Sequence, residues 1–225
     1  TRPTDVGCST PSECCDPCGF GMAALADRDA TPAGAALSTS DVVALAFEEE
    51  GCQILRQALE LAQPAEARGI AEQLHGFALR AALCPRAELV LQKVICHLGT
   101  EDAAFIAEEL APHARAVAQS GTGFNVLLRL LEFSSEDART VAFADQLLME
   151  DLPGLCCHKF GHCVVASLLS NGLQRQRARV VEALLQDTQR FARHRFASRV
   201  LEAALLYASA EEQAQIASAL MAQPG

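Results

Sequence analysis

The sequence contains no tryptophan, one tyrosine and few β-branched residues, although 50% of its 225 residues are hydrophobic. Strands favour aromatic and β-branched residues, whereas the abundant Ala, Leu, Glu, Gln and Arg favour helix. No apolar run approaches the roughly 18 residues of a membrane-spanning helix, because charges interrupt every helical stretch. We therefore expect an all-α protein with a sizeable core and no membrane partner.

Basic charge is also scarce, since 18 Lys and Arg stand against 28 Asp and Glu, a net charge of −10. Such a charge repels phosphate, but it is unevenly distributed. Residues 41–153 carry eight basic and eighteen acidic residues, a balance of −10, whereas residues 154–207 carry eight basic and three acidic residues, a balance of +5. Any affinity for nucleic acid should concentrate in the second of these segments. A phosphate-binding glycine loop and a serine-centred nucleophile elbow are both missing.

Residues 1–40 are rich in Gly, Pro, Ser, Thr and Ala and lack a sustained apolar period. We predict that they form a disordered arm ahead of a helical domain at 41–225. The chain begins with Thr and shows no basic-then-apolar secretory pattern, so we expect a fragment or a processed chain.

The ten cysteines fall into two groups. Six lie in apolar helical stretches, where cysteine acts as a small hydrophobe, and this favours a reducing compartment. The other four are in the arm, and their spacing contains one close CxxC pair. We expect flexible thiols there, incidental or redox-active, with a zinc site as the alternative. These four are Cys8, Cys14, Cys15 and Cys18.

The segment HKFGHCVVASLL at 158–169 recurs 36 residues later as HRFASRVLEAAL. The first version has the histidines and nearby thiols of a possible zinc cluster. In the second version Ser198 replaces His162 and Arg199 replaces Cys163, so the recurring pattern is structural and we expect no metal. We interpret the shared histidine, at positions 158 and 194, as structural or helix-capping.

Three earlier segments, 51–60, 87–96 and 123–132, align with 161–170 and 197–206. The second residues of the five segments are spaced 36, 36, 38 and 36 apart, and further helical stretches lie between them. Such a period predicts a solenoid whose repeats each contain more than one helix. The second residues are Cys52, Glu88, Phe124, His162 and Ser198. The expected core includes Val164, Val165, Val200 and Leu201.

The period and lines such as HRFASRVLEAALLYAS and LCPRAELVLQKVICHLG resemble Pumilio (PUF) repeats over residues 41–225, most specifically at 158–209. The resemblance implies a right-handed α-solenoid of three-helix repeats that forms a curved arc. The second helices would line its concave face, and each repeat would read about one base of single-stranded RNA. It implies a monomer without cofactor or catalytic activity, which binds messenger or ribosomal RNA in post-transcriptional regulation or RNA processing and regulatory proteins on its convex face. We expect a cytoplasmic location, with nucleus, nucleolus and organelles left open.

The resemblance also assigns roles to residues. In the last repeat Ser198 and Glu202 would bind a base edge and Arg199 would stack on the base, a trio that is similar to the guanine-reading type. In the earlier repeats the edge positions hold Cys52, Arg56, Glu88, Gln92 and His162, and the stacking positions include Gln53 and Asn125.

Two alternative functions stay open. The earlier trios are incomplete and the first half is acidic, which fits a protein-interaction scaffold that has lost base readout. A metal or thiol enzyme would instead use Cys156, Cys157, His158, His162 and Cys163. We favour RNA binding and expect no stoichiometric zinc.

Overall fold

The computed structural model describes residues 39–222, which belong to one compact unit. Helices are the only regular elements in this part of the chain, as the composition predicts. None of these helices combines the length and apolar character needed to cross a bilayer. The predicted arm and its four cysteines lie outside the described residues, apart from the last two positions of the arm, so its disorder stays a prediction.

The described helices form five repeats of three, which confirms the expected all-α solenoid of three-helix repeats. Repeat 1 contains α1 (Thr39–Phe47), α2 (Glu49–Leu61) and α3 (Pro64–Gln73). Repeat 2 contains α4 (Ala78–Ala82), α5 (Ala87–His97) and α6 (Thr100–Leu110), followed by a short 3-10 turn at Ala111–His113. Repeat 3 contains α7 (Ala114–Gln119), α8 (Gly123–Phe133) and α9 (Ala138–Glu150). Repeat 4 contains α10 (Leu152–Cys156), α11 (Gly161–Asn171) and α12 (Gln174–Leu185), and repeat 5 contains α13 (Thr188–Arg193), α14 (Ala197–Tyr207) and α15 (Ala210–Met221).

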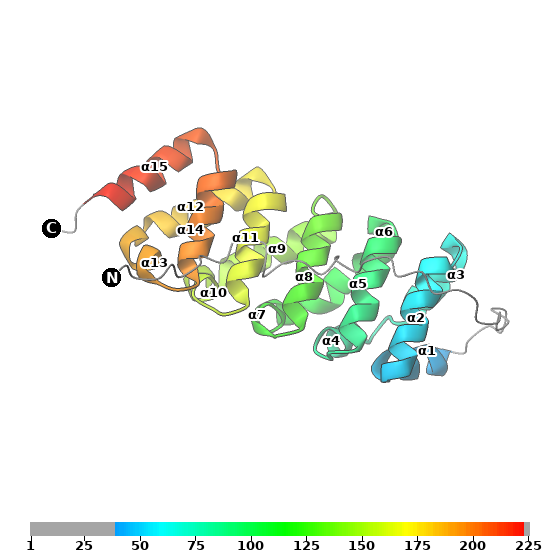
Figure 1. The fold of residues 1–225 in the computed structure, drawn as a ribbon. Coiled ribbons are helices and arrows are strands. Elements are labelled where there is room, and N and C mark those ends of the chain that lie inside the picture. The colour runs from blue at the N-terminus through cyan, green and yellow to red at the C-terminus, as the bar shows by residue number, and fades with distance from the viewer. Residues whose placement is uncertain (1–38, 223–225) are drawn as a thin grey trace, which may run out of the picture. The chain divides into compact units, whose positions relative to one another are not determined.

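Each second helix packs against the second helix of the next repeat, so that α2, α5, α8, α11 and α14 form one layer in chain order (Figure 1). The third helices make a second layer, in which α3 contacts α6, α6 contacts α9, α9 contacts α12 and α12 contacts α15. Stacking of this kind buries an apolar face that no single repeat could bury alone. The core therefore runs continuously through all five repeats, and Val164, Val165, Val200 and Leu201 all lie in it as predicted.

The first turn of every second helix approaches the preceding short helix closely, which restricts one position to a small residue. This position holds Gly51, Ala87, Gly123, Gly161 and Ala197, all buried. At Gly123 an added Cβ would lie 2.7 Å from the Val117 carbonyl oxygen, and at Gly51 it would lie 2.4 Å from the Leu45 carbonyl oxygen. A larger side chain would push the two helices apart.

Ion pairs join neighbouring repeats on the surface. Three connect repeats 1 and 2, one connects repeats 2 and 3, and two connect repeats 3 and 4, whereas none connects repeats 4 and 5 within residues 39–222. Each exposed pair stabilises the fold only slightly.

Candidate nucleic-acid interface

The predicted base-reading residues all lie on the second-helix layer, at equivalent positions of α2, α5, α8, α11 and α14. A row of helices with a constant spacing can present one set of side chains per repeat to an extended strand. The repeats differ, however, in how much of each set is accessible.

Repeat 5 presents its whole trio to solvent. Arg199 and Glu202 are exposed, and Ser198 is partly exposed. The Ser198 hydroxyl donates a weak hydrogen bond to the Arg195 carbonyl oxygen, with Oγ and O 3.4 Å apart. Ser198 and Glu202 are four residues apart on α14 and so lie on one face, with Arg199 beside them. This arrangement can offer a hydroxyl, a carboxylate and a guanidinium plane to a single ligand.

In repeat 4 the edge residue His162 is only 8% exposed, because its ring stacks on Phe196 of repeat 5. The ring centroids are 5.1 Å apart and the planes differ by 24°. His162 Nδ1 lies 3.0 Å from the His158 carbonyl oxygen, which requires Nδ1 to carry the proton and donate it. Burial lowers the pKa of His162; the contacts with the backbone of His158 and Lys159 act in the opposite direction, and the nearby Arg199 lowers the pKa further. His162 is therefore a neutral ring held between two repeats.

Repeats 2 and 3 share a polar contact between α5 and α8. The Glu88 carboxylate accepts a hydrogen bond from the Gln92 amide at 2.8 Å and another from Asn125 at 3.5 Å. Glu88 is 6% exposed, and burial raises the pKa of its carboxyl, although both hydrogen bonds act in the opposite direction. Three predicted RNA-contacting residues are thus bonded to one another in this structure.

At the next junction, Phe124 of repeat 3 stacks on Phe160 of repeat 4, with ring centroids 5.1 Å apart and planes 22° apart. This is the same position and nearly the same geometry as the stack of His162 on Phe196. Phe160 and Phe196 occupy the same position in the recurring segments HKFGHCVVASLL and HRFASRVLEAAL, but the recurrence alone does not identify them as partners of the preceding edge residue. The sequence signal for these partners is an aromatic residue that recurs after 36 residues, before α11 and before α14.

In repeat 1 the edge residue Cys52 is 3% exposed, and its thiol donates a hydrogen bond to the Arg86 carbonyl oxygen at 3.1 Å. Burial raises the pKa of this thiol. Beside it, Gln53 and Arg56 line a hollow of about 320 Å³ between α2 and α5, and Leu89 closes its other wall. The stacking residue and the second edge residue of repeat 1 are therefore accessible, while the first edge residue is not.

The first edge residue of each of repeats 1 to 4 consequently contacts the following repeat. Only Ser198, in the last described repeat, has no following repeat to contact within residues 39–222. A side chain that holds the next repeat in place is less available to a ligand, since binding a base would first break that contact. The accessible trio of repeat 5 is the strongest candidate site on this layer.

The histidines at positions 158 and 194 are helix-capping residues, as the sequence analysis predicted. His158 Nδ1 accepts hydrogen bonds from the backbone N–H groups of Phe160 and Gly161, both at 3.2 Å. His194 Nδ1 accepts from the equivalent groups of repeat 5 at 3.3 and 3.4 Å. In repeat 3 the equivalent residue is Ser120, whose Oγ accepts from Thr122 and Gly123 N–H at 3.3 and 3.2 Å. These side chains satisfy backbone donors that would otherwise lack partners at the helix start.

This capping role bears on the metal alternative. His158 Nδ1 uses its lone pair to accept two backbone hydrogen bonds, so the ring proton is on Nε2. Neither ring nitrogen of His158 therefore has a lone pair for a metal. Cys156 is completely buried, and burial raises the pKa of its thiol to about 12, which opposes the thiolate form that binds zinc. Within residues 39–222 no group of three or more His, Cys, Asp or Glu side chains is arranged so that it could hold a metal ion.

Basic side chains flank the starts of α11 and α14. The Lys159 ammonium lies 5.0 Å from the centre of the Phe160 ring, and the Arg195 guanidinium lies 5.3 Å from the centre of the Phe196 ring. Both side chains are exposed, so each cation is oriented by its ring without being neutralised. Positive charge is therefore fixed next to the accessible trio.

The sequence profile of the Pumilio-family RNA binding repeat matches this chain at residues 89–111, 153–185 and 189–221. These segments cover most of α5 and α6 and nearly all of repeats 4 and 5. No curated protein matches the chain closely enough in sequence to count as a relative.

Several solved structures share the fold. The crystal structure of PUF-8 in complex with PBE-RNA is similar with a TM-score of 0.76 and 22% identity, over 80% of this chain and 53% of that chain. The Puf4 RNA binding domain bound to an HO endonuclease RNA 3′ UTR recognition sequence gives 0.73 and 19%, over 78% and 54%. The RNA-binding domain of yeast Puf5p bound to SMX2 RNA gives 0.70 and 17%, over 80% and 52%. At these identities the likeness shows the fold, and this chain spans about half the length of each matched chain.

Proposed function

We propose that this chain, a member of the Pumilio repeat family, binds single-stranded RNA along its second-helix layer, with base-specific contacts centred on repeat 5. The observation that supports this most strongly is the accessible trio Ser198, Arg199 and Glu202 on α14. PUF-8, Puf4 and Puf5p, whose structures share this fold, were each solved with RNA bound.

The trio fits guanine best. A carboxylate is an acceptor only, so Glu202 can accept hydrogen bonds from the N1–H and N2–H donors on the Watson–Crick edge of guanine. Ser198 can reach the same edge, and the Arg199 guanidinium can stack on the face of the base. Base stacking stabilises such complexes by about 1–3 kcal/mol and tolerates any base, whereas the edge contacts discriminate.

The surrounding charge supports the same location. Residues 154–207 carry a balance of +5, and Arg190, Arg193 and Arg199 form no ion pair within the described part of the chain. Their charges are available to phosphate groups, and neutralising phosphate supplies much of the affinity of RNA-binding proteins. In this proposal each accessible repeat contacts about one base, and no catalytic step is involved. The chain acts as a monomer in the cytoplasm, in post-transcriptional regulation or RNA processing.

One observation favours a second function, a protein-interaction scaffold without base readout. In repeats 1 to 4 the first edge residue contacts the following repeat, and the trios of these repeats are incomplete. A scaffold would keep these contacts and lose any preference among bases.

The test begins with the affinity of the whole chain for a random pool of single-stranded RNA at two salt concentrations. Enrichment of a short motif supports RNA readout, whereas no retention at low salt supports the scaffold. The variant Glu202→Gln is then compared on RNAs that differ only at the base facing repeat 5. We expect a changed base preference, because glutamine presents a donor as well as an acceptor. Equal losses for all four bases would remove the case for readout by Glu202.

The matched control is Glu211→Gln on α15, which removes the same charge from an exposed position of the same repeat. It should leave the base preference unchanged. Arg199→Ala should weaken binding to all four bases to a similar extent, because stacking does not depend on the identity of the base.

A further inference from the structure

Two arginines precede Ser198 at a defined spacing. Arg193 and Arg195 stand five and three residues before it, and Ser198 is the one Ser or Thr in the sequence with arginine at both of these positions. Arg193 is the last residue of α13, Arg195 lies in the turn that follows, and Ser198 is the second residue of α14. Base reading by Ser198 requires its hydroxyl but not this spacing of cations. The proposed RNA binding therefore does not explain the spacing.

The arginines around Ser198 are not neutralised by carboxylates. Arg193, Arg195 and Arg199 are exposed, and none of them forms an ion pair within residues 39–222. Glu202 is the one acidic residue between positions 193 and 207 of the sequence. Positive charge therefore surrounds the Ser198 hydroxyl.

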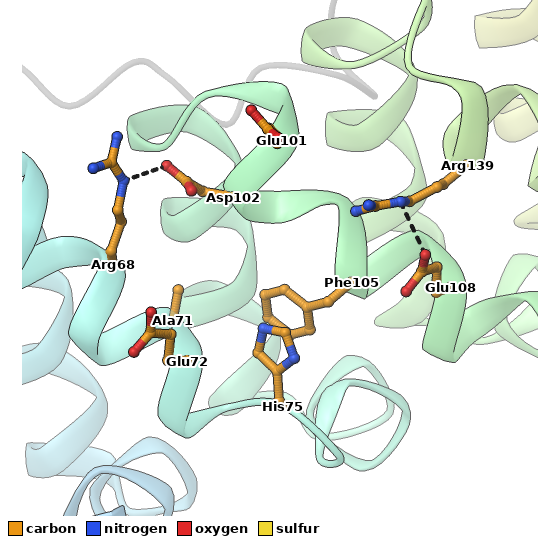
Figure 2. Close-up of a pocket in the computed structure, with 9 residues that line it drawn as sticks. All are labelled: Arg68, Ala71, Glu72, His75, Glu101, Asp102, Phe105, Glu108 and Arg139. Carbon is orange, nitrogen blue, oxygen red and sulfur yellow. Dashed lines mark hydrogen bonds and ion pairs between the residues drawn. The ribbon is translucent and has the colours of Figure 1, made fainter.

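A hollow in the acidic half of the chain shows the opposite arrangement. It has a volume of about 350 Å³ and lies on the third-helix layer, around the stacked rings of His75 and Phe105 (Figure 2). Arg68 lines it and pairs with Asp102 at 2.7 Å, and the second arginine of the lining is also paired with a carboxylate, at 2.9 Å. Both arginines of the hollow are thus held by neighbouring carboxylates, whereas those beside Ser198 remain available to a negatively charged protein surface.

The Ser198 hydroxyl is accessible and weakly bonded. Ser198 is partly exposed, and its Oγ donates a hydrogen bond to the Arg195 carbonyl oxygen at 3.4 Å. The equivalent residues of repeats 1 to 4 each contact the following repeat, and none of them has a hydroxyl. Ser198 can therefore react as a nucleophile with little change in its own contacts.

A phosphate on Ser198 would suit the folded repeat. Ser198 lies in the first turn of an 11-residue helix, whose N-terminus favours negative charge. Arg195 and Arg199 are near it in the chain and can each pair with a phosphate oxygen. A kinase reads its substrate as an extended segment, so the first turn of α14 must open during the reaction. Because the two hydrogen bonds from this turn to the His194 ring are long, at 3.3 and 3.4 Å, this local opening costs less than unfolding the domain.

We propose that Ser198 is phosphorylated by a protein kinase that selects arginine at the third and fifth positions before its target, with a nucleoside triphosphate as the phosphate donor. Kinases discriminate between substrates by charge patterns of this kind. Ser198 Oγ bonds to the γ-phosphorus as the bond from that phosphorus to the β-γ bridging oxygen breaks. The nucleoside diphosphate leaves with this oxygen, and a carboxylate of the kinase takes the hydroxyl proton.

Phosphorylation would release RNA from repeat 5, a consequence that rests on the proposed function. The phosphate adds a charge of about −1.5 to −2 at the position that would otherwise contact the base edge. It would pair with Arg199, which would otherwise stack on the base, and it would repel the phosphates of the RNA. Both effects weaken the same site.

The experiment treats the whole chain with magnesium ATP and the catalytic domain of a kinase that prefers arginine at these two positions, and mass spectrometry locates the phosphate. We expect Ser198 to be the main modified residue and Ser198→Ala to lose the modification. Arg195→Ala should lower the initial rate at Ser198 at least about tenfold, because the nearer of the two selected charges is lost. The matched control is Arg179→Ala, which removes the same charge from an exposed position of α12 and should leave the rate unchanged. Thermal unfolding checks that both variants fold.

The phosphorylated and untreated chains are then compared in their affinity for RNA enriched from the random pool. Phosphorylation should weaken binding at least about tenfold, and treatment with a phosphatase should restore it. An unmodified Ser198, or equal rates for Arg195→Ala and Arg179→Ala, would overturn the proposed site, and equal RNA affinity of the two forms would overturn the proposed release. If the untreated chain binds no RNA, the proposed function fails, whereas phosphate incorporation still decides whether Ser198 is a kinase target.

Discussion

The two ends of the solenoid use different contacts to hold neighbouring repeats together. Between repeats 1 and 2 the junction is polar, with a thiol donating to a carbonyl oxygen and three surface ion pairs. Between repeats 4 and 5 the junction is aromatic, with His162 stacked on Phe196 and no ion pair within the described residues. The comparison shows that the same three-helix repeat can stack on its neighbour through either polar or aromatic contacts. Near the junction between repeats 4 and 5, Arg190, Arg193 and Arg199 form no ion pair within the described residues, so their charges are available to a ligand.

The largest expected effect is on the aromatic junction. Phe196→Ala should lower the free energy of unfolding by about 2–3 kcal/mol, because it removes the stacking partner of His162 and leaves a cavity between repeats 4 and 5. Arg86→Ala, which breaks an exposed ion pair between repeats 1 and 2, should cost less than about 1 kcal/mol. Urea unfolding followed by circular dichroism measures both. Equal losses would contradict the distinction between the two junctions.

The second effect concerns charge and RNA. Arg190→Ala combined with Arg193→Ala should weaken binding of single-stranded RNA about tenfold at moderate salt and flatten the dependence of affinity on salt. The loss should be the same for every RNA sequence, because phosphate contacts carry no base information. Arg68→Ala combined with Arg115→Ala is the control, since both of these arginines are paired with carboxylates in the acidic half. If the control weakens RNA binding equally, RNA affinity is not concentrated in repeats 4 and 5.

A smaller effect should follow from the capping position before the second helix. His158→Ala should cost about 1 kcal/mol of stability, because two backbone donors at the start of α11 lose their acceptor. His158→Ser should retain most of the stability, since Ser120 fills the same role in repeat 3. Repeat 2 has Cys84 at this position, so Cys84→Ser should raise stability slightly. Thermal unfolding of the three variants is the measurement, and a loss in His158→Ser as large as in His158→Ala would argue against the capping explanation.

The smallest expected effect is a pH dependence specific to repeat 4. Burial holds the pKa of His162 below that of an unfolded chain, about 6.5. As the pH falls through about 6.5, the unfolded chain gains a proton that the folded protein resists, so stability decreases; above this range His162 contributes no pH dependence. His162→Phe copies the Phe124–Phe160 stack of the preceding junction and should remove this part of the decrease. The free energy of unfolding of both proteins is measured in urea at pH 7.5 and pH 5.5. If it falls by the same amount in both, His162 is not responsible for the decrease.

The repeat period of the sequence predicted a helical solenoid, and the resemblance to Pumilio repeats implied three helices per repeat. The segments aligned at 87–96, 123–132, 161–170 and 197–206 each begin at the first residue of a second helix and end one residue before its last. Period and composition carry this information because each repeat must bury the same face against the same kind of neighbour. The capping role of the two histidines was also predictable, since it depends on local geometry that recurs with the sequence.

The candidate site was only partly predictable. Alignment of the repeats identified Ser198, Glu202 and the equivalent positions, but it could not show which of them contact the next repeat. The exposure of Glu88 or His162 depends on Asn125 or Phe196, which are more than 30 residues away in the chain. Such contacts form only after the repeats have stacked.

The sequence by itself determined the period, the helices and the unequal distribution of charge, because these properties are local or additive along the chain. Only the tertiary structure decided which polar side chains face solvent and which bond to a neighbouring repeat. It also created the hollow around His75 and Phe105, whose residues come from three helices and the turn after α3 and share no common motif. The physical reason is that a surface formed between repeats depends on the pairing of side chains across them, and the period of the sequence does not specify that pairing.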